Sequence, residues 1–171
     1  GGSNTNRVKQ GLGDYENDEE LKEWAEKYSY PMIMGSLIHA MVHTRPDIAY
    51  AVSLLSRATA KPELWHYKAA QHLILYLRET RDLGIVYDQK KMWAHEARVT
   101  AATEHKFDPY FEASTDASFA DDEETHRSTS GFVVWFAGAP IEWECKRQPL
   151  VTLSTMESEY VAASRCVLAI R

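Results

Sequence analysis

The hydrophobic periodicity of this chain changes once, near Leu83, and that change limits the architectures that the chain can adopt. Before this point, apolar residues recur every three or four positions, as they do on one face of a helix. After it, short segments are apolar at every position or at every second position, as they are in strands. A helical half followed by a strand-rich half predicts an α+β fold.

The helical half contains three segments that each begin at a proline. Pro31, Pro46 and Pro62 suit the first turn of a helix, where the missing amide hydrogen costs nothing. The apolar stripes that follow have helical spacing and comprise Met34, Leu37, Ile38 and Met41, then Ile48, Ala51, Val52 and Leu55, then Trp65, Ala69, Leu73, Tyr76 and Leu77. We expect residues 15–88 to form a small N-terminal helical bundle, behind a disordered leader or tag remnant over residues 1–14.

The second half is expected to contain short strands and one helix. Four segments have strand-like composition: Leu83–Tyr87, Tyr110–Asp116, Phe132–Phe136 and Ile141–Cys145. Residues 89–109 form the expected connector, and Ala137–Pro140 the expected hairpin link. Ser154 and Glu157 have the spacing of a capping box, which predicts a helix running from there towards the end of the chain.

Two acidic residues of this half are candidates for metal chemistry. Asp116 ends the Tyr110–Asp116 segment, and Glu159 lies in the second turn of the last predicted helix. At helical spacing one narrow apolar stripe of that helix is expected to face the sheet: Met156, Tyr160, Ala163, Val167 and Ile170. Glu159 then lies about 60° from the centre of the stripe.

If that helix crosses a central strand, the carboxylates of Asp116 and Glu159 meet. Two carboxylates at one point repel each other, and a magnesium ion relieves the repulsion. Such a site supports phosphodiester hydrolysis, in which metal ions activate water and stabilise the charge on the phosphate. The alternative is that both carboxylates are simply solvated.

The net charge of -6 is concentrated in the C-terminal third, where residues 111–171 carry 10 acidic and 5 basic side chains. An autonomous nucleic-acid-binding domain usually presents a basic surface. Either the partner is not a nucleic acid, or other sequence supplies the basic surface. No apolar run approaches the roughly 20 residues that span a bilayer, and Cys145 and Cys166 cannot form a disulfide framework. We expect a cytoplasmic or nuclear protein that is neither secreted nor membrane-bound.

Two blocks of motifs follow one another along the chain. The first block, within residues 30–88, contains Met34–Leu37, Thr44–Val52, Leu55–Arg57 and Leu75–Thr80. The second block, within residues 110–165, contains Ser114–Ala117, Arg127–Gly131, Lys146–Pro149 and Leu153–Tyr160. With these motifs the chain resembles the copia-type retrotransposon polyprotein, at the point where reverse transcriptase passes into ribonuclease H.

The resemblance implies a thumb- or connection-like segment over residues 15–88 and a ribonuclease H-like domain over residues 110–171. It implies that Asp116 and Glu159 bind magnesium and are catalytic in cleaving the RNA strand of RNA–DNA hybrids. Two further metal-binding aspartates and two further strands of that fold would lie beyond Arg171. We therefore expect a truncated domain of three strands and one helix, with weak magnesium binding and weak or no activity.

The first strand of such a domain lacks one neighbour, and an unpaired edge invites pairing with another chain. We expect a homodimer, or a protein partner, at that edge. The alternative to an enzyme is a non-catalytic, domesticated interaction module that uses this edge and the helical bundle.

Two further patterns have plain interpretations. Phe119–Asp122 imitates the aromatic-x-Asp-Asp signature of reverse transcriptase, but we expect a solvated acidic loop there. Trp65, His66 and Tyr67 have aromatic rings that would stack on nucleic acid. Their helical spacing with Ala69 favours the core of the bundle instead.

Overall fold

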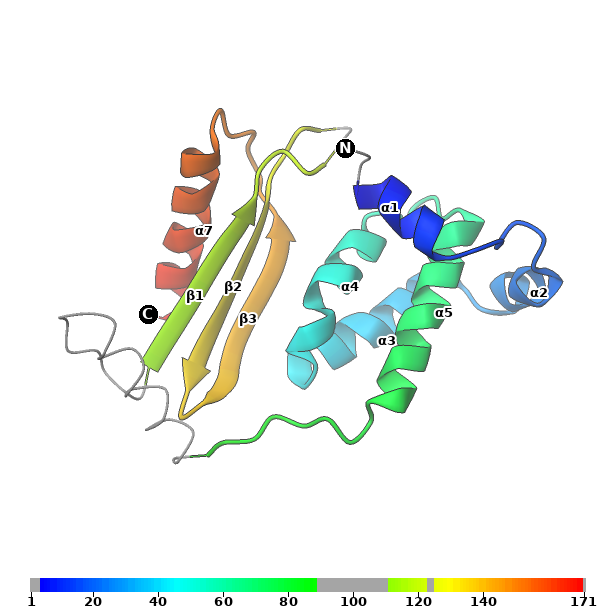
Figure 1. Ribbon diagram of the computed structural model, residues 1–171, viewed down its shortest axis with the longest axis horizontal. Helices are drawn as coiled ribbons and strands as arrows, with labels where there is room; N and C mark the ends of the chain where they lie inside the picture. The colour runs from blue at the N-terminus through cyan, green and yellow to red at the C-terminus, as the bar shows by residue number, and fades with distance from the viewer. Residues whose placement is uncertain (1–3, 89–110, 123–124, 171) are drawn as a thin grey trace. The chain divides into compact units, whose positions relative to one another are not determined.

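A computed structural model describes residues 4–88, 111–122 and 125–170. The chain divides into two compact units, Gly1–Leu83 and Gly84–Arg171 (Figure 1). Helices come first, and three strands and a helix follow, which confirms the predicted α+β class. The predicted connector over residues 89–109 lies outside the described residues. None of the described helices is both long enough and apolar enough to cross a bilayer.

The first unit is helical. Its elements are α1 (Asn4–Gly11), α2 (Glu19–Lys27), α3 (Tyr30–His43), the short 3-10 helix η1 (Pro46–Ile48), α4 (Ala49–Ser56) and α5 (Leu64–Glu79). Pro31 and Pro46 occupy first turns, as predicted. The expectation of a disordered leader is wrong for Asn4–Gly11, which form α1, and Val8 of α1 and the adjacent Leu12 pack against the apolar core.

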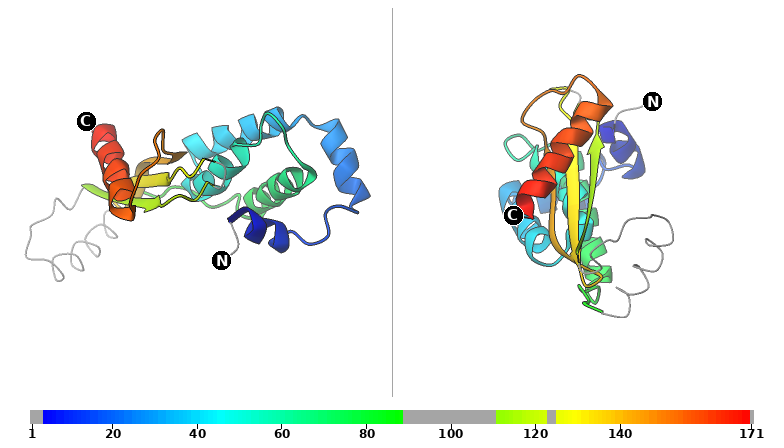
Figure 2. Two further views of the ribbon diagram at one scale, coloured as in Figure 1. Left: turned by 90° about the horizontal axis from the view of Figure 1, so that it is seen from above. Right: turned by 90° about the vertical axis from the view of Figure 1, so that its left-hand side faces the viewer.

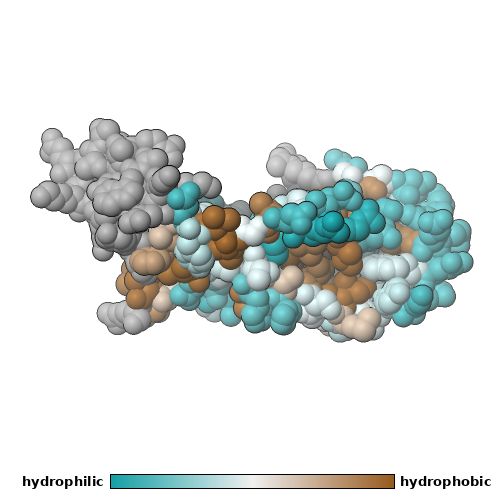
Figure 3. All heavy atoms as spheres, turned by 90° about the horizontal axis from the view of Figure 1, so that it is seen from below, coloured by the Kyte–Doolittle hydropathy of each residue, from teal (hydrophilic) through white to brown (hydrophobic). Residues whose placement is uncertain are grey.

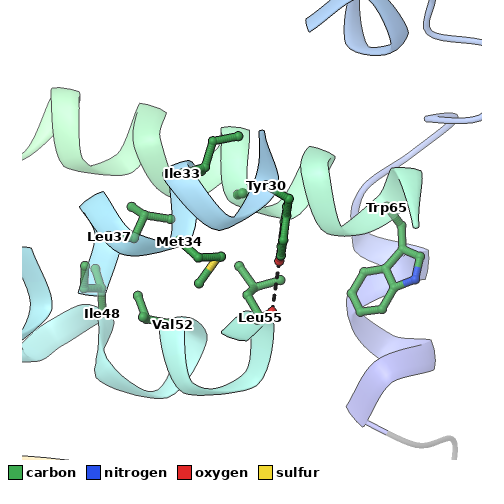
Figure 4. Close-up of a cluster of buried hydrophobic side chains, with 9 residues drawn as sticks. Tyr30, Ile33, Met34, Leu37, Ile48, Val52, Leu55 and Trp65 are labelled. Atoms are coloured by element: carbon green, nitrogen blue, oxygen red, sulfur yellow. Dashed lines mark hydrogen bonds between the residues drawn. The ribbon is translucent and has the colours of Figure 1, made fainter. Parts of the chain in front are cut away.

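One apolar cluster joins α3, α4 and α5 (Figure 4). Its buried members are Tyr30, Ile33, Met34, Leu37, Ile48, Val52, Leu55, Trp65 and Ala70. The Tyr30 hydroxyl donates a hydrogen bond to the Leu55 carbonyl at 3.0 Å, so the polar end of this ring is satisfied inside the core. Burial raises the pKa of Tyr30. Trp65 lies in the cluster and Tyr67 packs against it, which confirms their prediction as core residues.

The Thr44–Asp47 motif connects the start of α4 to the end of α5. The buried Arg45 guanidinium donates to both carboxylate oxygens of Asp47, at 3.0 and 2.7 Å, and to the Thr80 carbonyl at 3.2 Å. The Tyr76 hydroxyl also donates to Asp47, at 2.8 Å. The hydrogen bonds from Arg45 hold the pKa of the Asp47 carboxyl below its ordinary value. The Thr44–Asp47 motif of the first block therefore stabilises the contact between these two parts of the helical unit through charge-assisted hydrogen bonds.

The second unit is a three-stranded antiparallel sheet with one helix on it (Figures 1 and 2). Its elements are β1 (Phe111–Ser118), β2 (Thr129–Phe136), β3 (Ala139–Arg147) and α7 (Thr155–Ala169), with the strands in the order β1-β2-β3. The β2–β3 turn uses two residues with positive φ, Ala137 (49°) and Gly138 (77°), so the predicted four-residue link is too long.

The predicted strand over Leu83–Tyr87 is wrong. This segment forms no strand in the structure. It approaches the sheet at the β2–β3 turn, where the Asp88 N–H donates to the Ala137 carbonyl at 3.2 Å. The β-branched and aromatic composition that suggested a strand is not sufficient, because a strand also needs a neighbouring strand edge along its length.

The strand register defines two faces of the sheet. On the inner face, Phe132 and Val134 pack against Cys166 of α7. Their partners on β1, Thr115 and Ala113, lie on the same face, because paired residues of antiparallel strands share a face. Burial raises the pKa of the Cys166 thiol. The intervening residues of each strand lie on the outer face.

Helix α7 buries its small residues and exposes its large ones. The residues that face the sheet are Ser158, Ala162 and Cys166. The stripe predicted to face the sheet is mostly exposed instead, with exposed fractions of 68% for Met156, 71% for Tyr160, 57% for Val167 and 44% for Ile170. That prediction is wrong because Phe132 and Val134 already fill the inner face. A helix packs closely on such a face only through small side chains.

Candidate functional site

Asp116 lies near the C-terminal end of β1, on the outer face of the sheet. Its register partner is Gly131, which presents no side chain across from it. Its neighbours Thr115 and Ala117 lie on the inner face, opposite Phe132 and Ser130 of β2. The Asp116 side chain is exposed.

Glu159 lies in the second turn of α7 and is half-buried. A fully buried glutamine fixes this part of the helix. The Gln148 side-chain amide donates to the Ser130 hydroxyl at 2.7 Å and to the Ser158 carbonyl at 2.9 Å. Because Ser130 pairs with Ala117, this glutamine holds the first turns of α7 over the C-terminal end of β1.

The position of Glu159 around the helix follows from an ion pair on the other flank. Arg165 of α7 lies 2.8 Å from Glu144 of β3, so this flank faces β3. Glu159 is about 120° around the helix from Arg165, on the flank that faces the edge of β1. The two predicted ligands, Asp116 and Glu159, therefore lie at the same end of the unit and border the same strand, but from opposite faces of the sheet.

The described part of the chain contains no group of three or more His, Cys, Asp or Glu side chains placed to hold a metal ion. Asp116 and Glu159 thus remain a predicted pair of ligands. The geometry brings them to one end of the sheet, where the described residues add no third such side chain to form a cluster.

A buried polar network surrounds Gln148, and the sequence analysis missed it. The Ser128 hydroxyl forms a hydrogen bond with the Thr152 hydroxyl at 3.0 Å, and it accepts a hydrogen bond from the Ala120 N–H at 3.1 Å. The Gln148 N–H donates to the Ser128 carbonyl at 2.8 Å. One buried atom, Gln148 Oε1, has no hydrogen-bond partner among the described residues. The motifs Arg127–Gly131 and Lys146–Pro149 therefore supply the contacts that hold α7 on the sheet.

The acidic loop after β1 is partly a structural element as well. Asp122 is buried, and it accepts hydrogen bonds from Arg147 at 2.6 Å and from the Thr125 N–H and hydroxyl at 2.9 and 2.7 Å. Burial raises the pKa of Asp122, but these hydrogen bonds and the guanidinium charge hold the net pKa well below its ordinary value. Asp121 accepts from the Thr129 hydroxyl at 2.8 Å. The expectation of a solvated loop is wrong for Asp122, because Arg147 compensates for its burial.

Comparison with known proteins gives retrotransposon relatives that match most of the chain. The retrovirus-related Pol polyprotein from transposon TNT 1-94 of Nicotiana tabacum is 36% identical over 138 residues, which is 81% of this chain and 9% of the polyprotein. The putative transposon Ty5-1 protein of Saccharomyces cerevisiae is 31% identical over 142 residues, which is 82% of this chain and 41% of that protein. The chain therefore spans less than half the length of these two relatives.

A third relative is of comparable length. The secreted RxLR effector protein 161 of Plasmopara viticola is 34% identical over 135 residues, which is 79% of this chain and 84% of that protein. No protein-family model and no solved structure matches the chain.

Proposed function

Because this chain is homologous over most of its length to copia-type retrotransposon Pol polyproteins, we propose that its second unit is a ribonuclease H-like fragment. In this proposal Asp116 and Glu159 bind magnesium, and the ancestral reaction is cleavage of the RNA strand in an RNA–DNA hybrid. The helical unit is the thumb- or connection-like segment that precedes it. The supporting observation is that Gln148 holds α7 over the end of β1, so that both carboxylates border one strand.

The donor set agrees with magnesium in kind but is small. Magnesium takes oxygen ligands, and it is commonly held by one or two carboxylates together with water and substrate phosphates. Asp116 and Glu159 supply two carboxylates from opposite faces, and the described residues supply no cluster of three ligands. When bound, the metal would activate water and stabilise the negative charge on the phosphate. We accordingly expect weak metal binding and slow cleavage.

A nuclease assay on the full chain tests this proposal. A fluorescent RNA–DNA hybrid with magnesium should be cleaved slowly, and cleavage should fall at least 100-fold in Asp116→Asn and in Glu159→Gln, since such ligands act as a unit. Glu112→Gln is the matched control, because Glu112 is exposed and shares the outer-face row of β1 with Asp116. Cleavage that persists in both ligand variants would overturn the assignment of the site.

The second candidate function is a non-catalytic interaction module. The observation that favours it is the large apolar stripe that α7 leaves exposed, since a contiguous exposed apolar patch typically marks a binding surface. In the same assay, this function predicts no cleavage above the blank for the parent chain at any magnesium concentration.

A further inference from the structure

Two histidines lie one helical turn apart on the solvent-facing side of α3. His39 and His43 are both exposed, and their spacing of four residues brings their side chains to one face of the helix. The opposite face of α3 carries Tyr30, Met34 and Leu37, which are buried in the core of the helical unit. The apolar cluster that holds α3 in place includes neither histidine. Packing therefore fixes the helix without using either imidazole ring.

The two imidazole rings lie against each other. Their centroids are 4.2 Å apart, and the angle between the ring planes is 26°. The His43 Nδ1–H donates a hydrogen bond to the His39 carbonyl at 2.8 Å, since a carbonyl oxygen can only accept. In neutral His43 the lone pair is therefore on Nε2, at the outer end of the ring. This is the usual arrangement of a metal-binding histidine, because the hydrogen bond to the backbone fixes the tautomer and the ring orientation.

The end of α3 that carries the histidine pair is held by hydrogen bonds. The N–H groups of Thr44 and Arg45 both donate to the Ala40 carbonyl at 3.0 Å. The Arg45 guanidinium is in turn anchored on Asp47 and Thr80. Ligand side chains on a rigid element lose less conformational freedom when they bind. The carbonyl end of a helix also carries a partial negative charge, which favours a cation beside its last turn. Both the rigidity and the electrostatics of this turn therefore suit a cation.

The ligand chemistry selects the class of cation. Magnesium and calcium take oxygen ligands, whereas imidazole nitrogens suit divalent transition-metal ions such as zinc. We propose that His39 and His43 together bind one Zn²⁺ ion, with water in the coordination positions that the two imidazoles do not fill. This site goes beyond the proposed function, because it lies in the helical unit and shares no residue with the predicted magnesium pair, Asp116 and Glu159.

Calorimetric titration of the full chain with Zn²⁺ tests this site. His39→Gln and His43→Gln should each weaken zinc affinity at least about tenfold, because the second imidazole of a pair binds intramolecularly. His72→Gln is the matched control and should bind as the parent does. His72 is exposed on α5, and Lys68 and Tyr76 lie one turn away on either side of it. A parent chain that binds no zinc, or zinc binding that both pair variants leave unchanged, would overturn the proposal.

Two further measurements separate this site from a folding effect and from the predicted magnesium site. Without metal, the two pair variants should melt at the temperature of the parent, because substitutions of exposed side chains change stability little. Added Zn²⁺ should raise the melting temperature of the helical unit in the parent and not in the pair variants, since an ion that binds only the folded state stabilises it. Excess Mg²⁺ should leave the zinc affinity unchanged, because magnesium prefers oxygen ligands. Displacement of zinc by magnesium, or a melting shift that the pair variants retain, would contradict an imidazole site.

Discussion

The two units of this chain are stabilised in different ways. In the helical unit, large apolar side chains fill a single core, from Tyr30 and Met34 on α3 to Trp65 on α5. In the sheet unit, the buried apolar cluster is confined to Phe132, Val134 and Cys166, and a network of buried serines, threonine and glutamine completes the packing. The comparison teaches that α7 is positioned largely by hydrogen bonds, so that its large apolar residues remain available at the surface.

The helical unit also exposes apolar side chains, but in a different setting. Figure 3 shows brown apolar residues on its surface flanked by teal hydrophilic ones. The exposed members include Met32, Ile38, Val42, Ile74 and Leu75. Exposure of apolar side chains beside a filled core is normal for soluble domains. On α7, by contrast, exposure of the large residues accompanies burial of the small ones.

The largest expected effect is a loss of stability of the helical unit when a buried aromatic residue is removed from its core. Tyr30→Ala removes a buried ring and its hydrogen bond to Leu55, and it should lower the free energy of unfolding of this unit by about 3–5 kcal/mol. Met32→Ala, at a site 56% exposed on α3, should change it by less than about 0.5 kcal/mol. Urea denaturation followed by circular dichroism measures both. Equal losses in the two variants would contradict the assignment of the core.

The second largest effect is a loss of stability of the sheet unit when the hydrogen-bonding side chain of Gln148 is removed. Gln148→Ala leaves the Ser130 hydroxyl and the Ser158 carbonyl without their donor, which should cost about 1–3 kcal/mol. Amide hydrogen exchange should show faster exchange in α7 and unchanged exchange in α3. The control is Lys146→Ala, at an exposed neighbouring position. Unchanged protection of α7 in Gln148→Ala would show that apolar packing alone holds this helix.

A third effect is confined to acidic pH. The pKa of Asp122 lies below its ordinary value of 3.8, so the stability from its ionised form is present above that pH and is lost as the pH falls below it. Asp122→Asn keeps an acceptor for Thr125 but cannot titrate, so it should flatten the pH dependence of sheet-unit stability between pH 5 and 2. Asp47→Asn should do the same for the helical unit. Thermal melts across this pH range measure both. A slope that neither substitution changes would contradict these assignments.

The sequence predicted much of the helical unit because its signals are local. Pro31 and Pro46 at helix starts and apolar residues at helical spacing predicted α3, η1 and α4, whereas α5 begins at Leu64, two residues after the Pro62 that was expected in its first turn. The orientation of α7 was not predictable in this way, because the bulk of Phe132 and Val134 decides which face packs, and neither residue is near α7 in the sequence. The Gln148 network also depends on partners 18 and 10 residues away. The pairing of Asp116 with Glu159 stays a prediction.

The smallest expected effect is that of a substitution on the exposed side of α7, which we compare with one on its buried side. Val167→Gln alters an exposed side chain, so it should change the free energy of unfolding of the sheet unit by less than about 0.5 kcal/mol. Ala162→Val adds only two carbon atoms, but it should cost about 1–3 kcal/mol because position 162 is fully buried against the sheet. Urea denaturation compares them. A larger loss for Val167→Gln would mean that the exposed apolar stripe of α7 packs within the sheet unit, and the contrast between the two units would then disappear, because α7 would be held by large apolar side chains as α3 is.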